Sequence, residues 1–150
     1  MPHATMEYVI MAPILILQVV FFPLVTSWVM SFWIDSRRQI VLREAADHLG
    51  SLIQQIYFSL NHKNVPSGQV VYFPDLPKLI ENYAYAARGV LTSEGQNSSK
   101  VLELNLTLRR VGNTVETLVV LGPNIVWNEA TVYVSNSTNA GIIAEKFPNG

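Results

Sequence analysis

Residues 8–34 read YVIMAPILILQVVFFPLVTSWVMSFWI and contain no Asp, Glu, Lys or Arg. A helix needs roughly 20 apolar residues to cross the hydrocarbon of a bilayer, so this run is long enough to span a membrane with some tilt. The core helix of a small soluble domain is rarely apolar on every face. Trp28 and Trp33 lie near the end of the run, where amphipathic rings favour the membrane interface. The sequence therefore predicts a membrane-spanning helix over residues 8–34.

Two prolines, Pro13 and Pro23, lie inside this apolar run. Each lacks a backbone N–H and is expected to kink the helix. Lipid offers no donor for the carbonyl that a proline leaves unpaired, so neighbouring groups must supply one. The prolines therefore indicate a helix that packs against other helices rather than one that stands alone in lipid.

The run differs from a secretory signal peptide. The apolar region of such a peptide is only about 7–15 residues long and follows a basic start. Residues 1–6 contain no Lys or Arg, and residues 31–35 (SFWID) offer no small-x-small cleavage site. We expect the segment to be retained in the mature protein.

Composition narrows the classes of function. The net charge is −1, so no basic surface indicates a nucleic-acid partner. Cysteine is absent, which excludes a disulfide framework and thiol-based metal or redox chemistry. The three histidines are His3, His48 and His62, and no carboxylate stands at a metal-ligand spacing from them. No GxSxG or phosphate-binding loop occurs, so we expect a protein without catalytic activity, metal or cofactor.

Residues 35–62 continue the helix with a different pattern. Six apolar residues recur every three or four positions: Leu42, Ala46, Leu49, Ile53, Ile56 and Leu60. The polar residues lie mostly off this stripe, which predicts an amphipathic helix packed against a partner helix or its own globular domain. Gly50 weakens the helix and permits a bend or a close approach. Pro66, within the segment NHKNVPSG at residues 61–68, ends it.

Residues 63–150 have the pattern of short strands and turns. The clearest strand is residues 101–109, where four leucines alternate with polar residues and predict one buried face. Gly112 and Asn113 then form a turn, and residues 114–121 return as the hairpin partner. Residues 69–73 form a first apolar run, and residues 80–91 fit either a strand or a helix. Further strands are expected near residues 125–127, 131–134 and 141–146, and Tyr83, Tyr85 and Tyr133 are expected to pack around the sheet. The turns between strands predict a mostly antiparallel sheet or small sandwich.

Three N-x-Ser/Thr sequons occur in this half, at Asn97, Asn105 and Asn136. The alternation of residues 101–109 places Asn105 on the outward face of its strand, and the other two lie in polar, turn-like stretches. We expect at least one of them to carry an N-glycan.

The orientation signals disagree. Arg37 and Arg38 follow the apolar run and no basic residue precedes it, so the positive-inside rule places the C-terminal half in the cytoplasm. The sequons and the polar, turn-rich β half favour the outside. We interpret the β half as extracellular, because a missing basic leader accounts for the absent N-terminal charge. Full protection of the β half from protease added to whole cells would contradict this interpretation.

The segment HATMEYVI at residues 3–10 resembles the start of archaeal type IV pilin-like proteins with class III signal peptides, in which small residues precede a Glu-Tyr pair and an aliphatic run. In that family a prepilin peptidase removes a short leader, and the mature helix packs into the core of a helical filament. The resemblance implies a leader Met1-Pro2, cleavage between Pro2 and His3, and Glu7 as the fifth mature residue, paired with the N-terminal amine of a neighbouring subunit. It also places three further residues in the filament core, namely Tyr8, Pro13 and Pro23.

Together these features predict an α+β fold with four segments. Residues 1–7 are a short leader and helix start, residues 8–34 the apolar helix, residues 35–62 its amphipathic continuation, and residues 63–150 an extracellular β domain. The expected function is that of a structural subunit in a type IV pilus-like filament for adhesion, membrane-inserted before it assembles with identical subunits. The alternative is a single-span membrane protein that displays a small extracellular β domain for binding.

Overall fold

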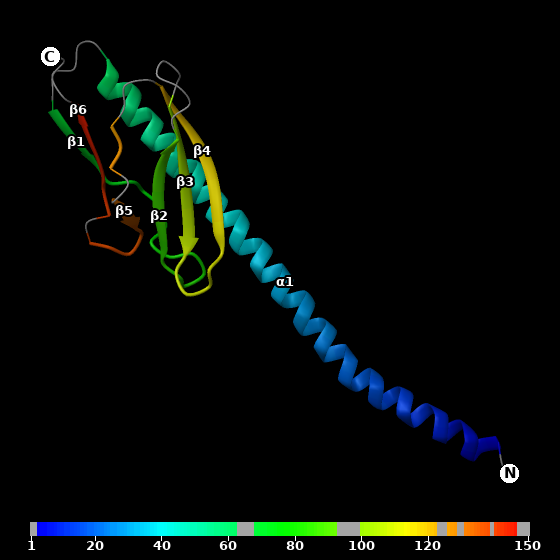
Figure 1. The fold of residues 1–150 in the computed structure, drawn as a ribbon. Coiled ribbons are helices and arrows are strands. Elements are labelled where there is room, and N and C mark those ends of the chain that lie inside the picture. Colours follow the sequence, from blue (N-terminus) through cyan, green and yellow to red (C-terminus); the bar gives the residue numbers. More distant parts are fainter. Residues whose placement is uncertain are drawn as a thin grey trace. The chain divides into compact units, whose positions relative to one another are not determined.

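The computed structural model describes residues 3–62, 68–92, 100–122, 126–128, 131–138 and 140–146, with the backbone alone for residues 3–7. The chain divides into two compact units between Arg37 and Arg38. The elements in chain order (Figure 1) are α1 (His3–Asn61), β1 (Gly68–Tyr72), β2 (Tyr85–Thr92), β3 (Lys100–Leu108), β4 (Thr114–Gly122), β5 (Val132–Val134) and β6 (Ile142–Lys146). One long N-terminal helix followed by antiparallel strands confirms the predicted α+β class.

The first part of α1 is an apolar helix without tertiary packing. Pro13 and Pro23 both lie inside the uninterrupted helix. The helix persists because each proline removes one backbone hydrogen bond while the adjoining turns keep theirs. Every described side chain from Tyr8 to Trp33 is exposed.

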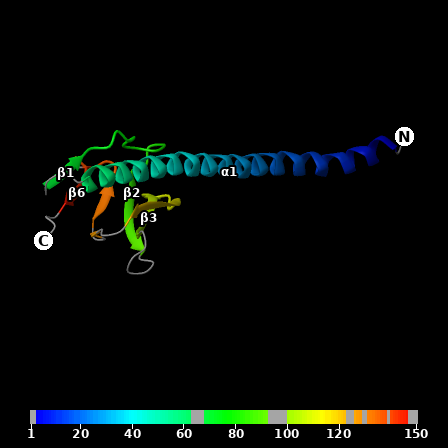
Figure 2. The ribbon, with the colours of Figure 1, turned by 90° about the horizontal axis from the view of Figure 1, so that it is seen from above.

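The second part of α1 is amphipathic, as its period predicts. Five residues of the predicted stripe are buried: Leu42, Ala46, Leu49, Ile53 and Leu60. Ile56, the sixth, is half-buried. In the C-terminal unit this part of α1 lies along one face of the four-stranded sheet, as Figures 1 and 2 show from two directions. The helix therefore packs against its own domain, which was one of the two partners that the pattern allowed.

Polar contacts join the helix to β4, the edge strand of that sheet. The Gln54 amide donates to the Val120 carbonyl at 3.0 Å, and the Thr117 hydroxyl donates to the Asp47 carboxylate at 2.9 Å. Between these contacts, a Cβ on Gly50 would lie 2.7 Å from Cγ2 of Val119. Glycine at position 50 thus permits a close approach between helix and strand, the second of the roles expected for it.

The four-stranded sheet has the order β4-β3-β2-β5, and every neighbouring pair is antiparallel. The predicted hairpin is confirmed, with β3 and β4 in register from Thr107↔Thr114 to Val101↔Val120. The four leucines of β3 are buried, and the residues between them are half-buried on the other face. Those leucines form the centre of the core beneath α1: Leu102, Leu104, Leu106 and Leu108.

The ambiguous segment 80–91 contains a tight turn followed by strand β2. Ile80 and Tyr83 exchange two backbone hydrogen bonds of 2.9 Å around Glu81 and Asn82, whose φ angles are 47° and 70°. This is the geometry of a two-residue turn with both central residues left-handed. Arg38 of the helix holds the turn through an ion pair with Glu81 at 2.8 Å and by lying over the Tyr83 ring at 5.4 Å.

The remaining strands differ from the prediction in one place. Strand β1 pairs antiparallel with β6 in a separate two-stranded sheet, and β5 pairs with β2. The strand predicted near residues 125–127 is wrong for the described residues, since residues 126–128 have no strand geometry. Trp127 contacts strand β2 through its side chain instead. Its indole N–H donates to the Gly89 carbonyl at 2.9 Å, and its ring occupies the space above that glycine.

Candidate assembly surface and glycosylation sites

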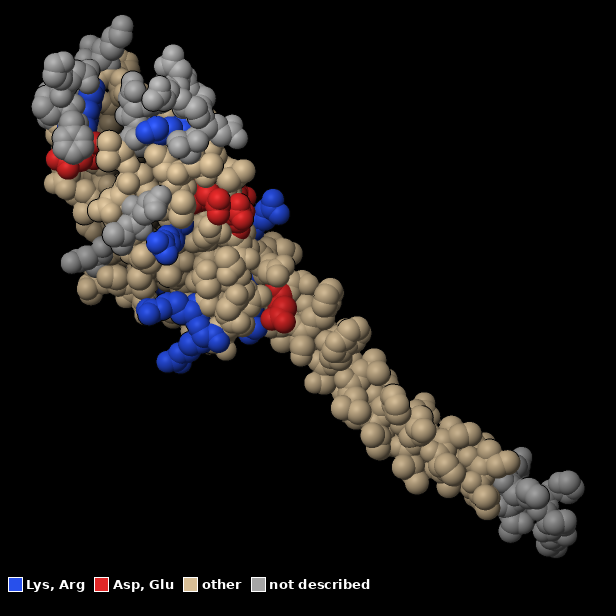
Figure 3. Space-filling model, viewed as in Figure 1, with Lys and Arg blue, Asp and Glu red and all other residues tan. Residues whose placement is uncertain are grey.

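The N-terminal unit presents an apolar surface along its described length. The apolar window of α1 has a mean hydropathy of 2.4 and none of it is buried within the chain. By length and composition α1 can cross a membrane, as an anchor or as a signal segment. Figure 3 shows acidic and basic side chains over the C-terminal unit, which begins at Arg38 and is called the β unit below, whereas the surface of residues 8–34 has neither. An apolar surface of this extent requires lipid or protein as its surroundings.

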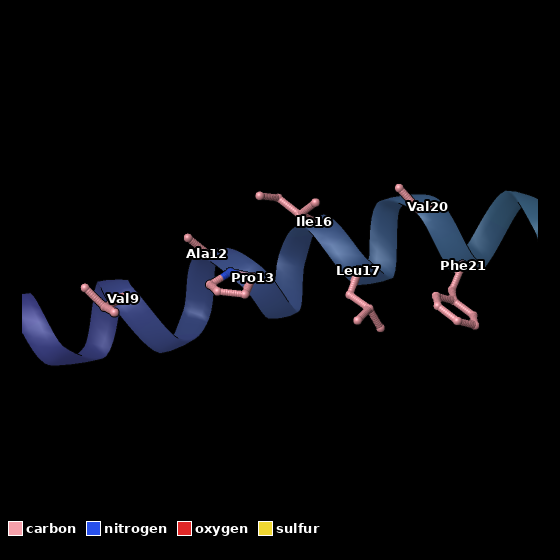
Figure 4. Close-up of a pocket in the computed structure, with 7 residues that line it drawn as sticks. All are labelled: Val9, Ala12, Pro13, Ile16, Leu17, Val20 and Phe21. Carbon is pink, nitrogen blue, oxygen red and sulfur yellow. The ribbon is translucent and has the colours of Figure 1, made fainter.

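Each proline of α1 lies in a shallow groove. The Pro13 groove is lined by apolar side chains, those of Val9, Ala12, Pro13, Ile16, Leu17, Val20 and Phe21 (Figure 4). In Figure 4 the Pro13 ring lies between side chains that extend to opposite sides, with Ile16 on one side and Leu17 on the other. The Pro23 groove includes hydroxyl groups and is lined by Phe22, Pro23, Thr26, Ser27, Met30, Ser31 and Ile34.

Two hydroxyl groups within residues 8–34 donate hydrogen bonds to backbone carbonyls of α1 itself. Thr26 donates to the Phe22 carbonyl at 2.8 Å, and Ser31 donates to the Ser27 carbonyl at 3.0 Å. At the polar end of the unit the Arg37 guanidinium lies 5.7 Å from the centre of the Trp33 ring, a cation–π distance. These contacts let polar groups remain on an apolar helix without a partner from outside.

The residues implied in processing and in the N-terminal charge pair are mostly outside the described part. Pro2 is not described, and for His3 and Glu7 only the backbone of α1 is described. Tyr8 is 76% exposed at the start of the apolar surface. The structure does not bring Tyr8, Pro13 and Pro23 together, because they are spread along one helix.

Two of the three sequons can be placed. Asn105 lies on the outward, half-buried face of β3, between Arg88 of β2 and Glu116 of β4, and donates to the Glu103 carboxylate at 2.8 Å. Asn136 is exposed in the turn after β5. Asn97 lies outside the described residues. The two asparagine side chains therefore differ in solvent exposure. Asn136 is exposed, whereas Asn105 is half-buried on the face of a sheet.

All three tyrosines that were predicted to pack around the sheet contact its core: Tyr85 belongs to the core, and Tyr83 and Tyr133 are partly buried against it. Tyr85 is fully buried, and its ring centre is 6.3 Å from that of Tyr133. Burial, reinforced by the neighbouring Tyr133 phenol, raises the pKa of Tyr85 well above its ordinary value. Burial also raises the pKa of Tyr133. Both phenols therefore remain neutral at physiological pH and act as packing groups.

Sequence reasoning missed two polar residues that the structure makes prominent. Ser135 is buried, accepts from the Tyr85 backbone N–H at 3.0 Å and donates to the Lys78 carbonyl at 2.8 Å. Gln18 is the single amide side chain in residues 8–34 and is exposed on the apolar helix. The isolated amide within an apolar run was the available signal for Gln18; nothing local identifies Ser135.

Across the described ranges, no group of three or more His, Asp or Glu residues could hold a metal ion. Comparisons with protein-family models, curated proteins and solved structures find no match to this chain.

Proposed function

We propose that the chain is a structural subunit of an extracellular type IV pilus-like filament, in which N-terminal helices bundle into a core and β domains form the outer layer. The observation that carries the proposal is the apolar surface of the first part of α1, where every side chain from Tyr8 to Trp33 is exposed. In a filament, neighbouring helices replace lipid around this surface. The resemblance of residues 3–10 to pilin-like proteins supports the same assignment.

The role of such a subunit is adhesion or attachment to a surface. The C-terminal unit supports it by folding around its own core, so that its outward faces are available to solvent, glycans or a surface. Of the two acceptors in the described part of the chain, Asn136 is the exposed one, so we expect glycosylation there before Asn105. Asn136→Gln should reduce the mass of the purified protein by one glycan, and Ser51→Ala, remote from any sequon, should leave the mass of the glycans unchanged.

Glu7 separates the filament from a membrane-anchored binding protein. A filament that relies on a Glu7 charge pair should lose assembly in Glu7→Gln, because the neutral amide cannot neutralise a neighbouring amine. Membrane insertion should persist, because residues 8–34 are unchanged. An Asp75→Asn variant, which removes one exposed carboxylate from the β unit, is the matched control and should assemble normally.

The assay is electron microscopy of material sheared from cells that produce the protein, with mass spectrometry of its N-terminus. Helical filaments with a chain beginning at His3 would support a processed pilin. Filaments whose chain retains Met1 would keep the assembly and exclude the cleavage. Protein recovered only as a detergent-extracted monomer would favour the single-span anchor displaying a binding domain.

A further inference from the structure

Gln18 is a polar side chain without a partner in an apolar setting. It is exposed and makes no hydrogen bond with any described residue, whereas Thr26 and Ser31 bond to carbonyls of their own helix. An amide placed in lipid or in a filament core without a hydrogen bond is costly, so it selects surroundings that provide an acceptor.

The same helix contains carbonyl groups that need a donor. Pro13 has no N–H for the Val9 carbonyl, and Pro23 has none for the Val19 carbonyl. The Pro23 groove contains the hydroxyls of Thr26, Ser27 and Ser31. The Thr26 and Ser31 hydroxyls donate to the Phe22 and Ser27 carbonyls rather than to Val19. No side chain that lines the Pro13 groove can donate a hydrogen bond, so the Val9 carbonyl needs a donor from outside the chain.

Gln18 cannot satisfy the Val9 carbonyl of its own chain. At about 100° per residue, position 18 is roughly 140° around the helix axis from Pro13, on the side away from the groove. It is also nine residues from Val9, about 13.5 Å along the axis. Gln18 is accordingly absent from the lining of both grooves. Donor and acceptor therefore lie on opposite faces of one helix.

We infer that the Gln18 amide of one copy donates to the Val9 carbonyl in the Pro13 groove of the next copy. This inference rests on the proposed filament. Because the two partners occupy different faces of the same helix, each copy offers one donor face and one acceptor face. Such a head-to-tail contact does not close on itself in pairs, and it propagates as an open polymer when the rotation between copies does not close a ring. Gln18 thereby sets which face of each helix meets its neighbour.

Cysteine cross-linking tests the arrangement of faces, since the chain has no native cysteine. Phe22→Cys marks the Gln18 face one turn away, and Ile16→Cys marks the Pro13 groove. A short bis-maleimide should convert assembled double-variant chains into a ladder of multimers, and each single variant should remain monomeric. Dimers from Phe22→Cys alone would show that the Gln18 faces meet each other and would overturn the inference.

Gln18→Met tests the hydrogen bond itself, because methionine keeps the length of the side chain and removes the amide. Filaments of this variant should dissociate in detergent roughly 3- to 15-fold faster, the effect of losing one interhelical hydrogen bond. Leu15→Met, on the same side of the helix, changes shape without removing a polar group and should leave the rate unchanged.

The outcomes separate this inference from the proposed function. Wild-type protein that forms no filaments would refute the filament and this contact together. Wild-type filaments combined with an unaltered Gln18→Met dissociation rate, or with no ladder from the double variant, would refute the contact alone.

Discussion

Gly50→Ala tests the close approach between α1 and β4. In an exposed helix interior, alanine is more stabilising than glycine by about 1 kcal/mol. At position 50, however, the new Cβ would lie 2.7 Å from Cγ2 of Val119, a stiff and buried side chain. Overpacking of this kind costs about 1–3 kcal/mol. We therefore expect the variant to be less stable than the wild type by about 1 kcal/mol, despite its better helix propensity.

A double-mutant cycle isolates the contact. Val119→Ala removes the clashing methyl group and alone should cost about 2 kcal/mol. The variant carrying both Gly50→Ala and Val119→Ala should be more stable than the sum of the two costs predicts, with a coupling of about 1–2 kcal/mol. Ser51→Ala, the adjacent exposed position on the same helix, should change stability by no more than about 0.5 kcal/mol.

The measurement is hydrogen exchange of the β3 and β4 amides in detergent-solubilised full-length protein, read by mass spectrometry. Exchange of these amides reports the opening of the β unit even where the N-terminal helix remains folded. Stabilisation of the β amides by Gly50→Ala, as at an ordinary exposed helix site, would refute the close approach. Strict additivity of the two variants would refute it as well.

Three further predictions concern the β unit and use the same exchange measurement. Leu106→Ala should destabilise it by about 2–5 kcal/mol, whereas Leu118→Ala, 64% exposed on β4, should have an effect within about 0.5 kcal/mol; equal effects would contradict the assigned faces. Arg38→Ala should cost about 1 kcal/mol by removing the Glu81 ion pair and the contact with the Tyr83 ring, and an unchanged stability would show that the turn is held by other groups. Because burial raises the pKa of Tyr85 above its unfolded value of about 10, the stability that its neutral form contributes is present below that pH and is lost as the pH rises further; Tyr85→Phe should reduce the loss, and an identical alkaline profile would contradict it.

The elements with strong local periodicity could be predicted from the sequence. The leucines of β3 alternate with polar residues, and the buried stripe of α1 repeats every three or four positions, so each pattern specifies both the element and its buried face. The turn at Glu81 and Asn82 could not be predicted in this way. Its left-handed backbone favours Gly, Asn or Asp at the first central position, where this chain has Glu.

Part of the candidate site could also be predicted from local sequence. The uncharged run of residues 8–34 identifies the apolar surface without any structure, because its length and composition alone satisfy the requirement of a span. The isolated amide of Gln18 acquires significance only when it is seen to have no partner, on the face opposite the Pro13 groove.

By itself the sequence determined the long helix, the change from an apolar to an amphipathic surface along it, and the β3–β4 hairpin. These depend on residues close together in the chain, whose spacing matches the period of a helix or a strand. Only the tertiary structure decided the strand order β4-β3-β2-β5, the pairing of β1 with β6, and the use of Trp127 as a side-chain contact on Gly89. Those choices depend on which distant surfaces fit together once the helix covers the sheet, and no local period encodes that fit.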